Sequence, residues 1–66
     1  MGEQVRAILA WAKERGGTFK VEPASTWWKA TAELPDAAGR MATNRVALAP
    51  SPEEAIGKLA VALGAA

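Results

Sequence analysis

The sequence contains neither cysteine nor histidine. Without cysteine, disulfides and thiolate metal sites are both excluded. Without histidine, the commonest general base and metal ligand of proteins is missing as well. A nucleophilic reaction would need a serine or threonine activated by lysine, and none of the hydroxyl residues lies in a catalytic motif. The sequence therefore predicts a protein without catalytic residues, metal or cofactor.

The acidic residues and the glycines offer no alternative chemistry. Asp36 is isolated in a loop, and Glu53 and Glu54 lie where a helix N-terminus favours negative charge. These positions do not form the facing pair that two-carboxylate catalysis needs. Gly16-Gly17 ends a helical pattern rather than opening one, so it is not a phosphate-binding loop. We expect a role other than catalysis.

Strong charge and long apolar runs are also missing. Eight basic and seven acidic residues give a net charge of +1, which creates no global field typical of nucleic-acid binding. No apolar run approaches the ~20 residues of a membrane span, and no basic-then-apolar signal segment opens the chain. We therefore expect a cytoplasmic protein that does not bind membranes.

The length of the chain limits its stability. The 66 residues predict a single small domain over 1–66. A chain of this size buries only roughly 60% of its unfolded surface. With no disulfide or metal available, its stability must come from core packing, supplemented by any oligomerisation.

Two helical patterns lie at the ends of the chain. The first covers residues 3–15, and Gly16-Gly17 ends it because glycine accepts the left-handed conformation of helix C-termini. The second opens at Ser51, where Pro52 suits the first helical position and Glu54 completes a capping box. The predicted inward side chains are Val5, Ile8, Leu9 and Ala12 in the first helix, and Ile56, Leu59 and Leu63, with Ala55 and Ala62 alongside, in the second.

Between the helices, three segments alternate polar and apolar residues, as half-buried strands do. They cover residues 18–22, 26–34 and 44–49, with a turn at residues 23–25 and a loop from residue 35, while residues 41–43 belong either to the loop or to the third strand. The fold class is thus predicted to be α+β, in the order α-β-β-β-α, with two helices packed on one face of a three-stranded antiparallel sheet. The inward strand residues are predicted to be Phe19, Val21, Trp28, Ala30, Ala32, Leu34, Val46 and Leu48.

Trp27 and Trp28 are adjacent in the second strand, so their side chains must point to opposite faces of the sheet. If Trp28 enters the core, Trp27 remains on the face that the helices leave open. We expect Trp27 to anchor a partner on that face. The other predicted partner-binding residues are Lys20, Lys29, Thr31 and Arg45 on the same face, together with Arg40 from the neighbouring loop.

A purely structural explanation of the same residues stays open. Cross-strand aromatic side chains often pack beneath the aliphatic stems of lysine and arginine. Glu22 and Glu33 are predicted on the same face, where they would neutralise the cations.

The second helix has an outward side made of small residues. Glycine inside a helix costs ~1 kcal/mol relative to alanine, so close approach of another helix is expected there. That helix is either the first helix of the same chain or the same helix of a second copy in a homodimer. The residues of this predicted dimer face are Gly57, Ala60, Val61 and Gly64.

The element order and the length resemble the double-stranded-RNA-binding domain, over nearly the whole chain. That resemblance implies the α-β-β-β-α fold. Members of the family bind the RNA backbone through basic residues at the start of their second helix. Here the corresponding stretch, residues 51–54, reads Ser-Pro-Glu-Glu and is acidic, so the resemblance implies the fold without the function.

Residues 28–63 are similar to antitoxins of the HicB type. The matching features are an aromatic strand residue at Trp28, the Leu34-Pro35 turn and the helix start at residues 51–55. The stretch between Pro35 and Ser51 is longer than that family's spacing, and the first helix has no place in its pattern. This resemblance implies an antitoxin-like protein that binds a partner.

In character the chain resembles small inhibitors encoded by phages and mobile elements, including anti-CRISPR proteins. The resemblance consists of a small domain without catalytic groups and with one aromatic, basic surface. It implies a non-catalytic binding protein that occludes a surface of a larger protein or complex. The alternative is a small module that binds RNA or DNA through the same residues, since indole rings stack on bases and cations pair with phosphates.

Overall fold

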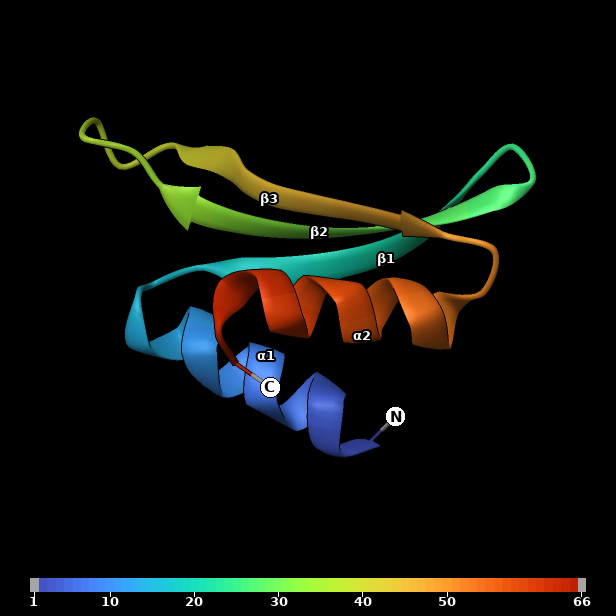
Figure 1. Ribbon diagram of the computed structural model, residues 1–66. Helices are drawn as coiled ribbons and strands as arrows, with labels where there is room; N and C mark the ends of the chain where they lie inside the picture. Colours follow the sequence, from blue (N-terminus) through green and yellow to red (C-terminus); the bar gives the residue numbers. More distant parts are fainter. Residues whose placement is uncertain (1, 66) are drawn as a thin grey trace.

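The computed structural model describes residues 2–65, which form a three-stranded antiparallel sheet with two helices on one of its faces (Figure 1). The strand order is β1-β2-β3, so each strand pairs with its neighbour along the chain. The predicted α+β class and the order α-β-β-β-α are confirmed. The elements are α1 (Gly2–Glu14), β1 (Thr18–Ala24), β2 (Trp27–Pro35), β3 (Met41–Ala49) and α2 (Pro52–Leu63).

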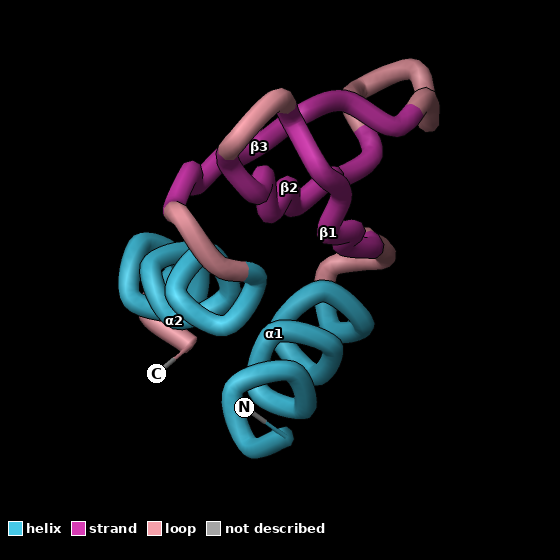
Figure 2. The backbone as a smooth tube through the Cα atoms, turned by 90° about the vertical axis from the view of Figure 1, so that its right-hand side faces the viewer, coloured by secondary structure: helices cyan, strands magenta, loops and turns pink. Residues whose placement is uncertain are grey.

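Each helix covers its own part of the sheet. Figure 2 shows α2 beneath β3 and β2, and α1 beneath β1. The two helices also pack against each other. No helix among residues 2–65 is long and apolar enough to cross a membrane. The opposite face of the sheet carries no secondary-structure element from the described part of the chain.

The first hairpin turns later than the sequence predicts. Strand β1 continues through Pro23 and Ala24, and only Ser25 and Thr26 form the turn. Proline has no backbone N–H to donate. It is tolerated here because β1 is an edge strand, and no other strand of residues 2–65 pairs with its outer side. Ser25 has φ 62°, a left-handed conformation that tight hairpin turns require.

The N-terminal helix buries a narrower stripe than predicted. Ile8 and Ala12 are buried, and Trp11 packs against the core from the edge of the helix. Leu9, predicted inward, is 49% exposed. The guanidinium of Arg15 lies 4.4 Å from the centre of the Trp11 ring, a cation–π contact that covers the outer side of the indole.

The C-terminal helix begins as the sequence predicts. The Ser51 hydroxyl accepts a hydrogen bond from the backbone N–H of Glu54 at 3.2 Å, and Pro52 is the first helical residue. The inward stripe differs at two alanines, since Ala60 is buried and Ala62 is exposed. The buried residues of α2 are Ala55, Ile56, Leu59 and Ala60.

The register of β3 is opposite to the prediction. Ala47 and Ala49 face the helices, whereas Val46 and Leu48 lie on the open face. The physical reason is packing: the core between the sheet and α2 is built largely of alanines, and small side chains from β3 fit it better than larger ones. The cluster of buried residues in the core comprises Ile8, Ala30, Ala32, Ala49, Ala55, Ile56, Leu59 and Ala60.

Candidate functional site

The open face of the sheet is defined by the side chains opposite the helices. Strand β2 contributes Trp27, Lys29, Thr31 and Glu33, because its alternate residues Trp28, Ala30 and Ala32 pack in the core. The pairing of the strands then places four rows across this face. The rows are Thr18–Glu33–Thr43, Lys20–Thr31–Val46, Glu22–Lys29–Leu48 and Ala24–Trp27.

One side of the open face is apolar. Trp27, Val46 and Leu48 are 48%, 48% and 49% exposed, and we refer to them as the apolar strip. Leu48 lies opposite Lys29, so it is a diagonal neighbour of Trp27 across β2 and β3. The sequence predicts Trp27 on this face but not Val46 and Leu48, because its alternation pattern favours both of them for the core.

The cations of the open face lie beside a carboxylate. The Lys29 ammonium is 3.8 Å and the Lys20 ammonium 4.0 Å from the same Glu22 oxygen. Exposed ion pairs of this kind contribute little to stability. They do reduce the local positive charge, as the structural explanation of these residues expected for Glu22.

Arg45 and Arg40 do not join this surface. Arg45 pairs with the buried Ala32 and therefore belongs to the helix side of the sheet, although its side chain is exposed. Its predicted outward register is wrong. Arg40 closes the loop after β2, whereas Trp27 begins that strand, so about 27 Å of strand separates them at ~3.4 Å per residue.

The loop that contains Arg40 is organised by Asp36. The Asp36 carboxylate accepts hydrogen bonds from the backbone N–H groups of Ala38 and Arg40, both at 2.9 Å. The Asp36 N–H donates to the Arg40 carbonyl at 2.7 Å. These bonds account for the acidic residue that the sequence left isolated, and they give it a structural role in the turn.

Thr31 occupies the centre of the open face. It is only 4% exposed, because it lies on the middle strand between Lys20 and Val46. Its hydroxyl is buried and has no hydrogen-bond partner among residues 2–65. A buried hydroxyl without a partner costs free energy, so this site holds a polar group that water no longer reaches.

Replacing Thr31 by valine is expected to raise the free energy of unfolding by about 1 kcal/mol. Valine keeps the shape and removes the unsatisfied hydroxyl. Urea unfolding followed by circular dichroism measures the change. Thr43→Val is the matched control, because Thr43 is exposed on the same face and its hydroxyl is solvated. A loss of stability in Thr31→Val alone would show that the hydroxyl has a partner after all.

The four residues of the predicted dimer face on α2 do not share one exposed surface in the structure. A β-carbon added at Gly57 would lie 3.3 Å from the Gln4 amide of α1, so Gly57 faces the first helix of the same chain. Ala60 is fully buried in the core, which contradicts its predicted outward position. Val61 is 70% exposed, and Gly64 ends the helix with φ 71°.

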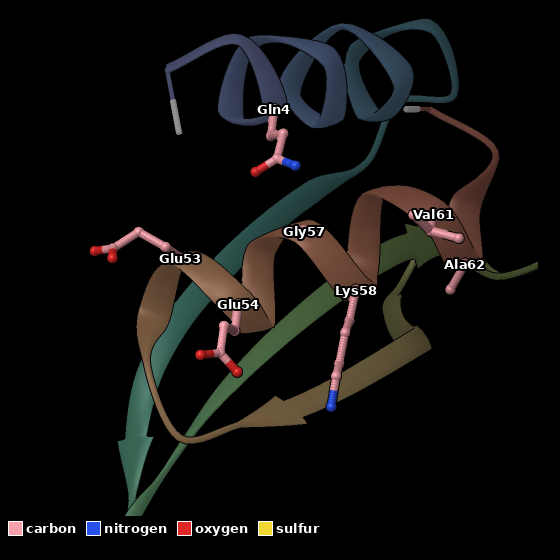
Figure 3. Close-up of a pocket in the computed structure, with 7 residues that line it drawn as sticks. All are labelled: Gln4, Glu53, Glu54, Gly57, Lys58, Val61 and Ala62. Atoms are coloured by element: carbon pink, nitrogen blue, oxygen red, sulfur yellow. The ribbon is translucent and has the colours of Figure 1, made fainter.

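A shallow hollow of about 660 Å³ lies along the outer side of α2 (Figure 3). Its lining is mostly apolar, with charged side chains at the margin. Figure 3 shows Lys58 leaving the hollow toward β3, where its ammonium donates a hydrogen bond to the Leu48 carbonyl at 3.3 Å. The lining residues are Gln4, Glu53, Glu54, Gly57, Lys58, Val61 and Ala62.

No protein-family model, no curated protein and no solved structure matches the chain at a significant level. The element order shared with the double-stranded-RNA-binding domain is therefore a likeness of architecture alone. Within residues 2–65, no group of three or more acidic residues lies close enough together to hold a metal ion.

Proposed function

We propose that the protein is a non-catalytic binding module that covers a surface of a larger protein with the open face of its sheet. The observation that carries the proposal is the apolar strip, in which Trp27, Val46 and Leu48 are each about half exposed. Aromatic side chains surrounded by apolar contacts contribute most of the energy of protein interfaces. An inhibitor or an antitoxin would act through such a surface by occlusion.

The charges of the open face support a protein partner over a nucleic acid. Lys20 and Lys29 share Glu22, so the face carries charges of both signs beside the strip. Binding to a phosphate backbone relies on a concentration of cations, and Arg45 lies on the other side of the sheet. Mixed charges around an apolar centre resemble the polar rim of a protein interface.

Trp27→Ala is expected to weaken binding of the partner at least tenfold while leaving the fold intact. An anchor of this kind contributes about 2 kcal/mol or more, and Trp27 is half exposed in the free chain. The immobilised protein is first used to capture candidate partners. Titration calorimetry with each purified candidate then gives the dissociation constant. Circular dichroism checks that the variant folds.

Leu9→Ala is the matched control. Leu9 is as exposed as Trp27 but lies on α1, in the helical layer. The Leu9→Ala variant should bind the partner with an unchanged dissociation constant. Equal losses in the two variants would contradict a site on the open face. Salt-dependent quenching of tryptophan fluorescence by an oligonucleotide, abolished in Trp27→Ala, would instead establish the nucleic-acid alternative.

A further inference from the structure

The two edges of the sheet are protected unequally. Edge strand β1 carries Pro23 and the charged residues Lys20 and Glu22, which discourage pairing with another strand. The stretch 45–49 of the other edge strand, β3, contains no proline, no acidic residue and no lysine. Its single charge is Arg45. Unprotected edges of this kind pair with a further strand.

The direction of the backbone groups along β3 follows from the first hairpin. Ala24 and Trp27 flank the two-residue turn and form a hydrogen-bonded pair, so Trp27 directs its N–H and C=O toward β1. Because this direction alternates along a strand, Ala30 directs its groups toward β3, and its partner Ala47 directs its own toward β2.

Val46 and Leu48 therefore direct their backbone groups to the free edge. The hydrogen bond from Lys58 to the Leu48 carbonyl agrees with this assignment, since the ammonium reaches that oxygen from outside the β2–β3 ladder. Both residues also place their side chains in the apolar strip. The free edge thus combines outward backbone groups, of which the Leu48 carbonyl is covered by Lys58, with two aliphatic side chains.

This edge is complementary to itself in one antiparallel register. With a two-fold axis at Ala47, Val46 lies opposite Leu48 of the second copy, and the symmetry repeats the pair. Both residues present outward backbone groups, so each pair exchanges its two N–H···O bonds. Arg45 then lies opposite Ala49 of the second copy, which avoids an encounter of like charges.

Neighbouring registers lack this match. An axis at Arg45 sets two guanidinium groups directly opposite each other. An axis at Val46 sets Leu48 against Asn44, the extra residue of a β-bulge, because Ala32 pairs with Arg45 and Glu33 with Thr43. An axis at Leu48 sets Val46 against Pro50, which has no N–H to donate.

Helix α2 would meet its own copy in the same arrangement. It lies beneath β2 and β3, on the side of the β3 edge (Figure 2). Strands pair ~4.8 Å apart, so the two α2 axes would lie about 10 Å apart, a distance at which helices pack. The apolar hollow and Val61 would then be covered by the second copy.

We propose that the chain forms a two-fold homodimer in which β3 pairs with β3 of a second copy around Ala47. One continuous sheet then joins the three strands of each copy, and the two apolar strips meet at its centre. Lys58 covers the Leu48 carbonyl in the single chain and must release it when the strands pair, which weakens the association. The fraction of dimer rises with protein concentration, because two chains associate.

Single cysteines test the position of the axis in a chain that has none of its own. Ala47→Cys should form a disulfide-linked dimer under mild oxidation, because a non-hydrogen-bonded pair sets the Cα atoms about 4.5 Å apart. Arg45→Cys should react at least tenfold more slowly, because its copies would be offset by about 14 Å along the strands at ~3.4 Å per residue. Equal rates in the two variants would overturn the proposed register.

Sedimentation equilibrium tests the dimer itself. The unmodified chain should change from monomer to dimer mass with rising concentration. Val46→Lys should raise the dimer dissociation constant at least tenfold, and its half-exposed position preserves the monomer fold. Thr18→Lys, on the other edge strand, should leave the constant unchanged. A monomer mass for the unmodified chain at all concentrations, or equal effects of the two lysines, would overturn the proposal.

Discussion

Leu59→Ala is expected to lower the free energy of unfolding by about 2–5 kcal/mol. Leu59 is fully buried, and it is one of the few large side chains in a core composed mainly of alanine. Alanine neighbours have no flexible groups that move into a cavity, so little of the lost contact is recovered. A domain of 66 residues has a stability of roughly 3–10 kcal/mol, so the change removes a large part of it. Urea unfolding followed by circular dichroism measures the loss.

Two further substitutions on the same helix make this result interpretable. Val61→Ala also truncates an aliphatic side chain to alanine, but this side chain is 70% exposed, so the change should alter the stability by less than about 0.5 kcal/mol. Ile56→Val removes one methylene group from the core and should cost about 0.5–1.5 kcal/mol, which keeps the protein folded. If Leu59→Ala costs no more than Val61→Ala, the assigned inward face of α2 is wrong.

The local features of the fold are predictable from the sequence. The Ser51 cap depends on residues within one helical turn, and the structure confirms its bond to Glu54. The alternation along β2 places Trp28 against the core and Trp27 on the open face, as predicted. Each of these outcomes is decided by neighbours in the chain, so a pattern in one segment contains the necessary information.

The register of β3 is not decided locally. One set of alternating residues contains Val46 and Leu48, and the other contains Ala47 and Ala49. Hydrophobicity alone selects the larger pair for the core, which is the wrong choice here. The buried residues that face one another between β2, β3 and α2 are mostly alanines, so the smaller pair fits this interface, and that constraint arises from tertiary packing.

The candidate site likewise contains residues placed by local pairing, which are predictable, and residues placed by tertiary packing, which are not. Lys20, Lys29 and Trp27 are brought together by the β1–β2 hairpin, whose pairing is local and predictable. The observed register of β3 is opposite to the predicted one. The open face therefore carries Val46 and Leu48 where the prediction placed Arg45. The face is consequently more apolar and less cationic than the sequence indicates. A signal existed in the sequence, since alanines at alternate positions in β2 already predicted a core lined by small residues.

Gly17→Ala is expected to lower the free energy of unfolding by about 2–3 kcal/mol, because it inserts a methyl group where the connection between α1 and β1 lies against β2. The added β-carbon would collide with the Glu33 carbonyl oxygen and lie 2.5 Å from Leu34 Cδ2. The backbone cannot easily retreat, since the Gly17 N–H donates to the Ala12 carbonyl at 2.7 Å and the next residue, Thr18, pairs with Glu33. Thermal and urea unfolding of the variant measure the loss.

Gly57→Ala is the informative comparison, because its expected effect has the opposite sign. There the added β-carbon meets only the end of the flexible Gln4 side chain, at 3.3 Å, and that amide has room to turn. Alanine in a helix interior is favoured over glycine by up to about 1 kcal/mol, so this variant should be more stable than the parent. If both substitutions stabilise the protein, the connection from α1 to β1 does not press against β2. If both destabilise it, α1 and α2 hold Gln4 more rigidly than their contact indicates.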